Sequence, residues 1–153
     1  IAQQAAGAIN VEQVIDDFYE MLQQTAVANL LSREFYASRA LVPGSVRVRR
    51  EHNFAYIDDQ GRLIQGSIDR LVLLYDGDQL VAADVIDFKT DADTAGAVDR
   101  HREQLIAYCE AASRIFDLST EQISMHLLMT ASGEVAQVAP TSGEFRTALS
   151  GSD

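Results

Sequence analysis

The spacing of apolar residues predicts helix in the first third of the chain. Apolar side chains recur every three or four positions with acidic residues between them, at Val11, Val14, Ile15, Phe18 and Leu22. This is the spacing of one face of an amphipathic helix, and Asn10 is suited to cap its N-terminus. A second, shorter helix is expected over residues 32–40, because Pro43 and Gly44 follow it as a stop signal.

The middle third of the chain has the composition of strands. β-branched and aromatic residues fill three segments, at residues 45–56, 63–75 and 80–89. Turn-forming sequences, Asp58-Asp59-Gln60-Gly61 and Asp76-Gly77-Asp78, separate them. Three consecutive strands joined by short turns predict an antiparallel meander.

Helical spacing returns over residues 97–116, and two short strands are expected at residues 123–129 and 135–138. The order α-β-β-β-α-β predicts an α/β fold of α+β-like character, with a central mixed sheet flanked by helices. We expect the helices of residues 1–44 to pack on a core formed by residues 45–140. The small, polar residues 141–153 are expected to form a tail that is partly disordered.

Composition narrows the setting of the protein. A length of 153 residues suits one domain, and the single cysteine, Cys109, excludes an internal disulfide and a multi-cysteine metal site. The chain has neither a membrane-spanning run nor a signal-like start, and it begins without methionine. We therefore expect a segment of a longer protein in a reducing, cytoplasmic setting, without a membrane partner.

The formal net charge of −11 argues against a protein that grips nucleic acid by itself, because phosphate neutralisation dominates such binding. A nucleic-acid function would need either a local gathering of basic residues or another part of the molecule that delivers the strand. The candidate basic residues are Arg47, Arg49, Arg50, Arg100 and Arg102.

The sequence Asp87-Phe88-Lys89 ends the third expected strand and is the first candidate for chemistry. Strand side chains alternate between faces, so Asp87 and Lys89 share a face. Metal-dependent phosphodiester hydrolysis can use such a pair, with the carboxylate on a divalent cation and the lysine beside the developing negative charge. On its own, the pair is more typical of a plain surface salt bridge than of a catalytic site.

Asp69, on the preceding strand, is the second candidate carboxylate. A three-residue turn would pair Asp69 with Val85, and a five-residue turn would pair it with Asp87; both place the two acids on one face. A turn of two or four residues would separate them unless a β-bulge compensates. Shared metal chemistry therefore predicts an odd turn or a bulge. On the next helix, Gln104 and Tyr108 are four residues apart and so share a face, where they could support a phosphate.

Together these segments resemble the PD-(D/E)XK nuclease superfamily. The matching segments are Gly66-Ser67-Ile68-Asp69-Arg70, Val85-Ile86-Asp87-Phe88-Lys89-Thr90 and the Gln104-x-x-x-Tyr108 pair, preceded by a Glu51-x-x-Phe54 element. The closest likeness is to the RecB-like nuclease domain at the C-terminus of AddA- and RecB-type helicase–nucleases of the UvrD/Rep-like group. The resemblance implies a restriction-endonuclease-like core and a DNA nuclease, exonuclease-like, that acts in double-strand break repair and recombination.

The resemblance also implies roles for individual residues. Asp69, Asp87 and the Phe88 carbonyl would hold Mg²⁺, or Mn²⁺ in its place, and Lys89 would act on the attacking water or the scissile phosphate. Gln104, Tyr108 and Glu51 would support the substrate or the site. The implied partners are single-stranded DNA, the ATP-dependent helicase domains of the same protein and a second subunit.

One departure from the family pattern stands out. RecB-like domains usually draw a histidine ligand from a helix upstream of the Glu-x-x-Phe element, but no histidine precedes His52 here. The fragment could therefore be inactive alone. The alternative function is a degenerate, non-cutting module of the same fold that guides DNA or contacts another subunit.

Overall fold

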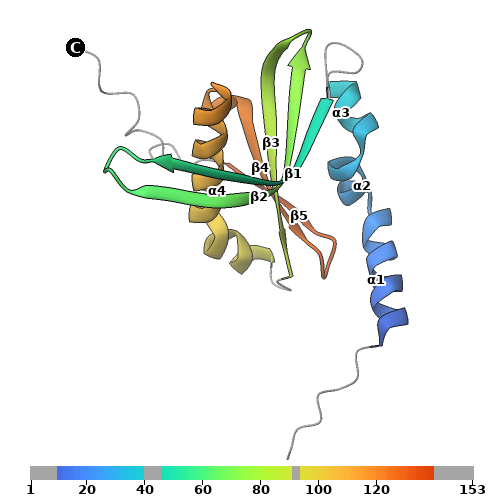
Figure 1. Cartoon of the computed structure of the whole chain (residues 1–153). Coiled ribbons are helices and arrows are strands. Elements are labelled where there is room, and N and C mark those ends of the chain that lie inside the picture. The colour runs from blue at the N-terminus through green and yellow to red at the C-terminus, as the bar shows by residue number, and fades with distance from the viewer. Residues whose placement is uncertain (1–9, 40–45, 91–93, 140–153) are drawn as a thin grey trace, which may run out of the picture.

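The computed structural model, which describes residues 10–39, 46–90 and 94–139, has three layers (Figure 1). A five-stranded mixed sheet has one long helix on one face and two short helices on the other, and a further helix at the N-terminal end extends beyond the sheet. The helices are α1 (Val11–Gln23), α2 (Thr25–Leu31), α3 (Arg33–Arg39) and α4 (Thr94–Phe116), with a short 3₁₀ turn, η1 (Thr120–Gln122). The strands are β1 (Val46–Ile57), β2 (Leu63–Asp76), β3 (Gln79–Lys89), β4 (Ile123–Met129) and β5 (Val135–Val138).

The strands lie in the order β1-β2-β3-β4-β5. Tight turns make the β1–β2, β2–β3 and β4–β5 pairs antiparallel, whereas β3 and β4 are parallel. A parallel pair needs a long crossover, and α4 supplies it. The α+β architecture with a mixed central sheet, expected from the sequence, is therefore confirmed.

The N-terminal helices differ in part from the expectation. The helix expected at residues 32–40 is α3, and the Ser32 hydroxyl caps it by accepting a hydrogen bond from the Phe35 N–H (3.1 Å). The sequence-based prediction missed α2, which is short and has no side-chain cap hydrogen bond. Pro43, Gly44 and residues 141–153 lie outside the described residues.

Two apolar clusters, one on each face of the sheet, form the core. On the α4 face, Leu105 and Cys109 pack against residues of the sheet such as Leu71, Val85 and Leu127. On the opposite face, residues of α2 and α3 cover a second set of strand residues; the members of this cluster are Met21, Val27, Leu30, Tyr36, Val46, Val72, Leu74, Ile86 and Leu128. These faces alternate along β3 and β4, as the period of a strand requires.

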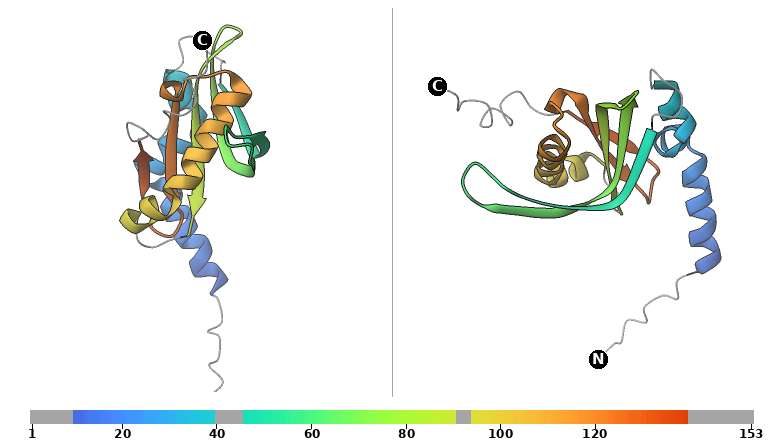
Figure 2. Two further views of the ribbon diagram at one scale, coloured as in Figure 1. Left: turned by 90° about the vertical axis from the view of Figure 1, so that its left-hand side faces the viewer. Right: turned by 45° about the horizontal axis from the view of Figure 1, so that its top comes forward.

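Helix α1 leaves most of its apolar face exposed. Asn10 caps its start, as expected, by accepting a hydrogen bond from the Gln13 N–H (3.4 Å). All ten residues from 11 to 20 are nevertheless exposed, and the core contacts begin only at Met21. Figure 2 shows α1 extending beyond the sheet, while the β1–β2 hairpin curves around α4. None of the described helices is long and apolar enough to cross a bilayer.

Candidate functional site

The register of the β2–β3 hairpin brings Asp69 to the level of Asp87. Arg70 pairs with Ile86, and Leu71 pairs with Val85. One step further along the same antiparallel register, Asp69 stands opposite Asp87. The two acids therefore lie side by side on neighbouring strands.

A β-bulge makes this alignment possible. The hairpin closes with the pair Asp76–Gln79, a two-residue turn that alone would place the acids on opposite faces. The register then shifts by one between Leu74 and Tyr75, which pair with Ala82 and Leu80. The extra residue on β3 restores the shared face. The sequence-based prediction of an odd turn or a compensating bulge is confirmed.

Hydrogen bonds link the candidate residues across three elements. The Phe88 backbone N–H donates to Asp69 Oδ2 (2.8 Å), which ties the first carboxylate to β3. Lys89 Nζ lies 2.8 Å from Asp87 Oδ2 and donates to Gln104 Oε1 on α4 (3.0 Å). Gln104 Nε2 in turn donates to the Tyr108 hydroxyl (2.5 Å). The structure thus brings five of the residues singled out from the sequence into one contiguous network, with Asp69, Asp87, Lys89, Gln104 and Tyr108 as its members.

Burial gives this network unusual electrostatics. Asp87 is 1 % exposed, and removing its carboxylate from water raises the pKa of Asp87; Lys89 opposes this rise and Asp69 adds to it. Burial likewise raises the pKa of Tyr108, which stays protonated and able to donate a hydrogen bond. A cation bound beside the two carboxylates would oppose the rise in the pKa of Asp87 and favour its ionised form.

The donor atoms suit a hard divalent cation. Asp87 Oδ2 is buried and forms an ion pair with Lys89 Nζ, 2.8 Å away. Two carboxylates and the Phe88 carbonyl are oxygen ligands of the type that Mg²⁺ binds together with water. Within the described ranges, no three His, Cys, Asp or Glu side chains converge as a complete protein-only metal site.

Glu51 stands apart from the network. Its side chain is exposed on β1 and makes no hydrogen bond or ion pair within the described part of the chain. Its backbone, however, lies in the β1–β2 ladder at the level of Asp69, between the pairs Arg50–Arg70 and His52–Ile68. Glu51 also has a left-handed backbone, with φ of 47°.

One sequence signal strengthens the site and was not used in its prediction. Lys89 is the only lysine of the chain, and all the other basic residues counted as Lys or Arg are arginines. Lysine presents a compact point charge on a flexible stem, whereas arginine presents a planar, forked guanidinium, so the two side chains are not interchangeable at a specific site. The single lysine of the chain lies at the position for which a functional lysine was predicted.

The exposed arginines of β1 contact aromatic rings on the sheet and on α4. The Arg47 guanidinium lies 4.6 Å from the centre of the Tyr75 ring, and that of Arg49 lies 5.9 Å from the centre of the Phe116 ring. On α4, Arg102 donates to the Ala139 carbonyl (3.1 Å). Arg47, Arg49 and Arg102 thus contact other groups of the same chain. They do not change the net negative charge of the protein.

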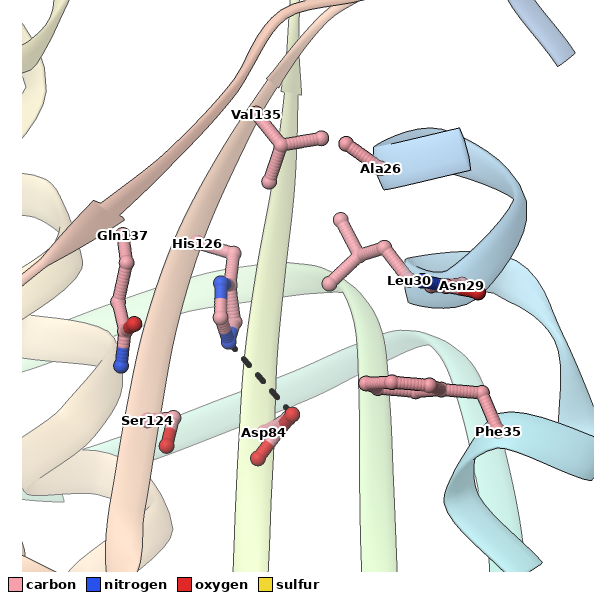
Figure 3. A pocket seen from close by; sticks show the side chains of 9 residues that line it. All are labelled: Ala26, Asn29, Leu30, Phe35, Asp84, Ser124, His126, Val135 and Gln137. Carbon is pink, nitrogen blue, oxygen red and sulfur yellow. Dashed lines mark ion pairs between the residues drawn. The ribbon is translucent and has the colours of Figure 1, made fainter. Parts of the chain in front are cut away.

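A second polar cluster lies on the opposite face of the sheet and was missed in the sequence. Asp84 is 1 % exposed, and its Oδ2 lies 3.5 Å from Nε2 of His126. Both line a cavity of about 450 Å³ between the sheet and α2 and α3, together with apolar residues such as Leu30 and Val135 (Figure 3). The sequence signal for this cluster was strand alternation. Asp84 directly precedes Val85 and lies three positions before Asp87, so it belongs on the face opposite both.

Comparisons with known proteins do not identify the chain. No protein-family description matches it, and no curated protein is significantly similar to it.

Proposed function

We propose that this chain is the Mg²⁺-dependent nuclease domain of a helicase–nuclease, with a PD-(D/E)XK-type site and a restriction-endonuclease-like core. The observation that carries the proposal is the alignment of Asp69 and Asp87 across the bulged hairpin, with Lys89 beside them. The two strands thereby bring together two carboxylates and an ammonium group, which phosphodiester hydrolysis with a divalent cation can use.

Asp69, Asp87 and the Phe88 carbonyl would hold the cation, either Mg²⁺ or Mn²⁺. A cation bound there would polarise the phosphate and lower the pKa of its bound water. The hydrogen bond from the Phe88 N–H keeps the Asp69 carboxylate in place without ligand, so little reorganisation is needed on binding.

The remaining residues orient and stabilise the substrate. Lys89 is held between Asp87 and Gln104, and its ammonium can neutralise negative charge that develops on the phosphate. Because the Tyr108 hydroxyl accepts a hydrogen bond from Gln104, its own proton is available for a phosphate oxygen. Both α4 residues thereby support the substrate strand.

The acidic surface fits a domain to which DNA is delivered. A net charge of −11 repels a polyanion, so free DNA would bind weakly. Tethering to helicase domains raises the effective concentration of a single strand near the site. We therefore place the break-repair function in the complete helicase–nuclease, with DNA, the helicase domains and a second subunit as partners.

Cleavage of labelled single-stranded DNA by the complete protein tests the proposal. With Mg²⁺ or Mn²⁺, Lys89→Met should lower the cleavage rate by roughly 100- to 1,000-fold while the fold is retained. Arg62→Met is the matched control, because it also removes one positive charge, from a side chain that is 66 % exposed at a hairpin turn.

The outcomes separate the proposal from its rival. Cleavage that survives both Lys89→Met and Asp87→Asn would refute the nuclease site. Metal binding without cleavage in the complete wild-type protein would instead favour the non-cutting module. The observation behind that alternative is that no third acidic or histidine side chain joins the site among the described residues.

A further inference from the structure

Strands β1 and β2 both change the face that they present to α4 at the level of the candidate site. On β1, Arg49 lies over the Phe116 ring of α4, whereas further along the strand Phe54 packs into the α4-face cluster. On β2, Leu71 and Ile68 both belong to this cluster. Residues an odd number of positions apart should point to opposite faces of a regular strand. Each strand therefore changes phase once, without loss of register between them.

On β1, the change of face coincides with an irregular backbone at Glu51. Glu51 has φ of 47° while its neighbours belong to the strand, and it lies between the paired residues Arg50 and His52. Left-handed backbone is unfavourable for residues other than glycine, asparagine and aspartate. A strained residue maintained inside a ladder, at the level of Asp69, is an observation that calls for a functional reason.

The change of face has a consequence for Lys89 through a short chain of contacts. Beyond Glu51, the hairpin turns Phe54 onto Tyr108, with ring centres 5.6 Å apart in an edge-on arrangement. Tyr108 accepts a hydrogen bond from Gln104, and Gln104 accepts one from Lys89. Without the change of face, Phe54 would point away from α4 and Tyr108 would lose this support.

We infer that Glu51 is a positioning residue, and that its left-handed backbone rather than its carboxylate sets the arrangement of Tyr108, Gln104 and Lys89. The exposed carboxylate has no partner in the described residues, whereas the backbone determines where the outer hairpin packs. The consequence for cleavage rests on the proposed nuclease function. The consequence for geometry does not.

Two substitutions at Glu51 separate backbone from side chain. Glu51→Gly removes the carboxylate and adopts positive φ readily, whereas Glu51→Val favours an extended backbone. Asp117→Val is the matched control, because Asp117, just after α4, also has positive φ (53°) but lies outside the network. We expect Glu51→Val and Asp117→Val each to lower the melting temperature by roughly 3–8 °C.

The single lysine provides the decisive measurement. In protein labelled with ¹³C-lysine, one Cε–Hε correlation reports on Lys89. Glu51→Val should shift this signal, whereas Glu51→Gly and Asp117→Val should leave it in place. In the complete protein, the rate of DNA cleavage should fall at least tenfold for Glu51→Val and should not fall for Glu51→Gly or Asp117→Val. If Glu51→Val does not fold, Glu51→Ala replaces it, because alanine also disfavours positive φ.

Two outcomes would overturn the inference. An unshifted Lys89 signal in folded Glu51→Val would show that the backbone at this position does not set the network. Equal shifts in Glu51→Gly and Glu51→Val would assign the effect to the carboxylate. If the wild-type protein cleaves no DNA, the nuclease proposal fails, but the Lys89 signal still decides whether Glu51 positions the network.

Discussion

The close approach of the hairpin to α4 makes a sharp prediction about Gly66. A methyl group added there would lie 2.8 Å from Phe54 Cζ and 3.3 Å from Tyr108 Cε1. Carbon atoms in favourable contact are about 3.5–4.0 Å apart, so the Phe54 ring would have to move by roughly 0.7 Å or more. Overpacking of this kind costs about 1–3 kcal/mol.

The sign of the effect carries the information. Gly66 is not among the residues with positive φ, so alanine would otherwise stabilise the fold by about 0.4–1 kcal/mol through the unfolded chain. With the clash included, Gly66→Ala should lower the free energy of unfolding by up to roughly 2.6 kcal/mol. For a domain of this size, the melting temperature should fall by up to roughly 10 °C.

Thermal unfolding followed by circular dichroism measures this effect, and a double-mutant cycle assigns its cause. In a Phe54→Leu background the ring is absent, so Gly66→Ala should become neutral or stabilising. Gly61→Ala is the control. Gly61 has φ of +77°, and an added methyl would have no atom within 4 Å, so the stability that Gly61→Ala loses should be the same with Phe54 or Leu at position 54. A Gly66→Ala protein more stable than wild type would refute the close approach, as would an unchanged loss in the Phe54→Leu background.

Three further predictions concern burial. Burial raises the pKa of the Cys109 thiol to about 12, so a thiol reagent should modify it only as fast as the protein unfolds; rapid labelling of folded protein would contradict this. Burial raises the pKa of Asp87, so the contribution of this carboxyl group to stability is complete below the unfolded pKa of 3.8 and is lost as the pH rises through the folded pKa. In urea unfolding with EDTA, Asp87→Asn should therefore become more stable relative to wild type from acidic to neutral pH. A stability difference that does not change with pH would contradict the raised pKa. Leu127→Ala should cost about 2–5 kcal/mol, while Phe18→Ala, at a side chain 51 % exposed, should change stability by about 0.5 kcal/mol or less; a large loss for Phe18→Ala would show that α1 is covered in solution.

Much of the fold could be predicted because periodicity and turn residues are local signals. The last two strands, residues 123–129 and 135–138, were expected at the bounds observed, since Gly and polar residues separate two short apolar runs. Helix α2 was missed because seven residues show too few turns of periodicity to be distinguished from a loop. The stripe of α1 was recognised as apolar, but spacing alone does not reveal whether a partner covers it.

The candidate site depended on information that the sequence contains only in part. The common face of Asp87 and Lys89 followed from strand alternation, and that of Gln104 and Tyr108 from helical spacing. The bulge between Leu74 and Tyr75 could be required but not located, because bulges depend on how neighbouring strands twist and pack. Asp84 and His126 are far apart in sequence, and only the parallel pairing of β3 with β4 brings them together.

The bulge also limits how the length of this hairpin can vary. Asp69 and Asp87 face each other only while an odd number of residues separates them, and the turn at Gly77 lies at the far end of both strands. An exposed hairpin tip usually tolerates single insertions or deletions. Here a net change of one residue, whether in the tip or at the bulge, would rotate Asp87 to the opposite face with the fold otherwise intact. In sequences with this architecture, length changes between the two acids should therefore occur in pairs.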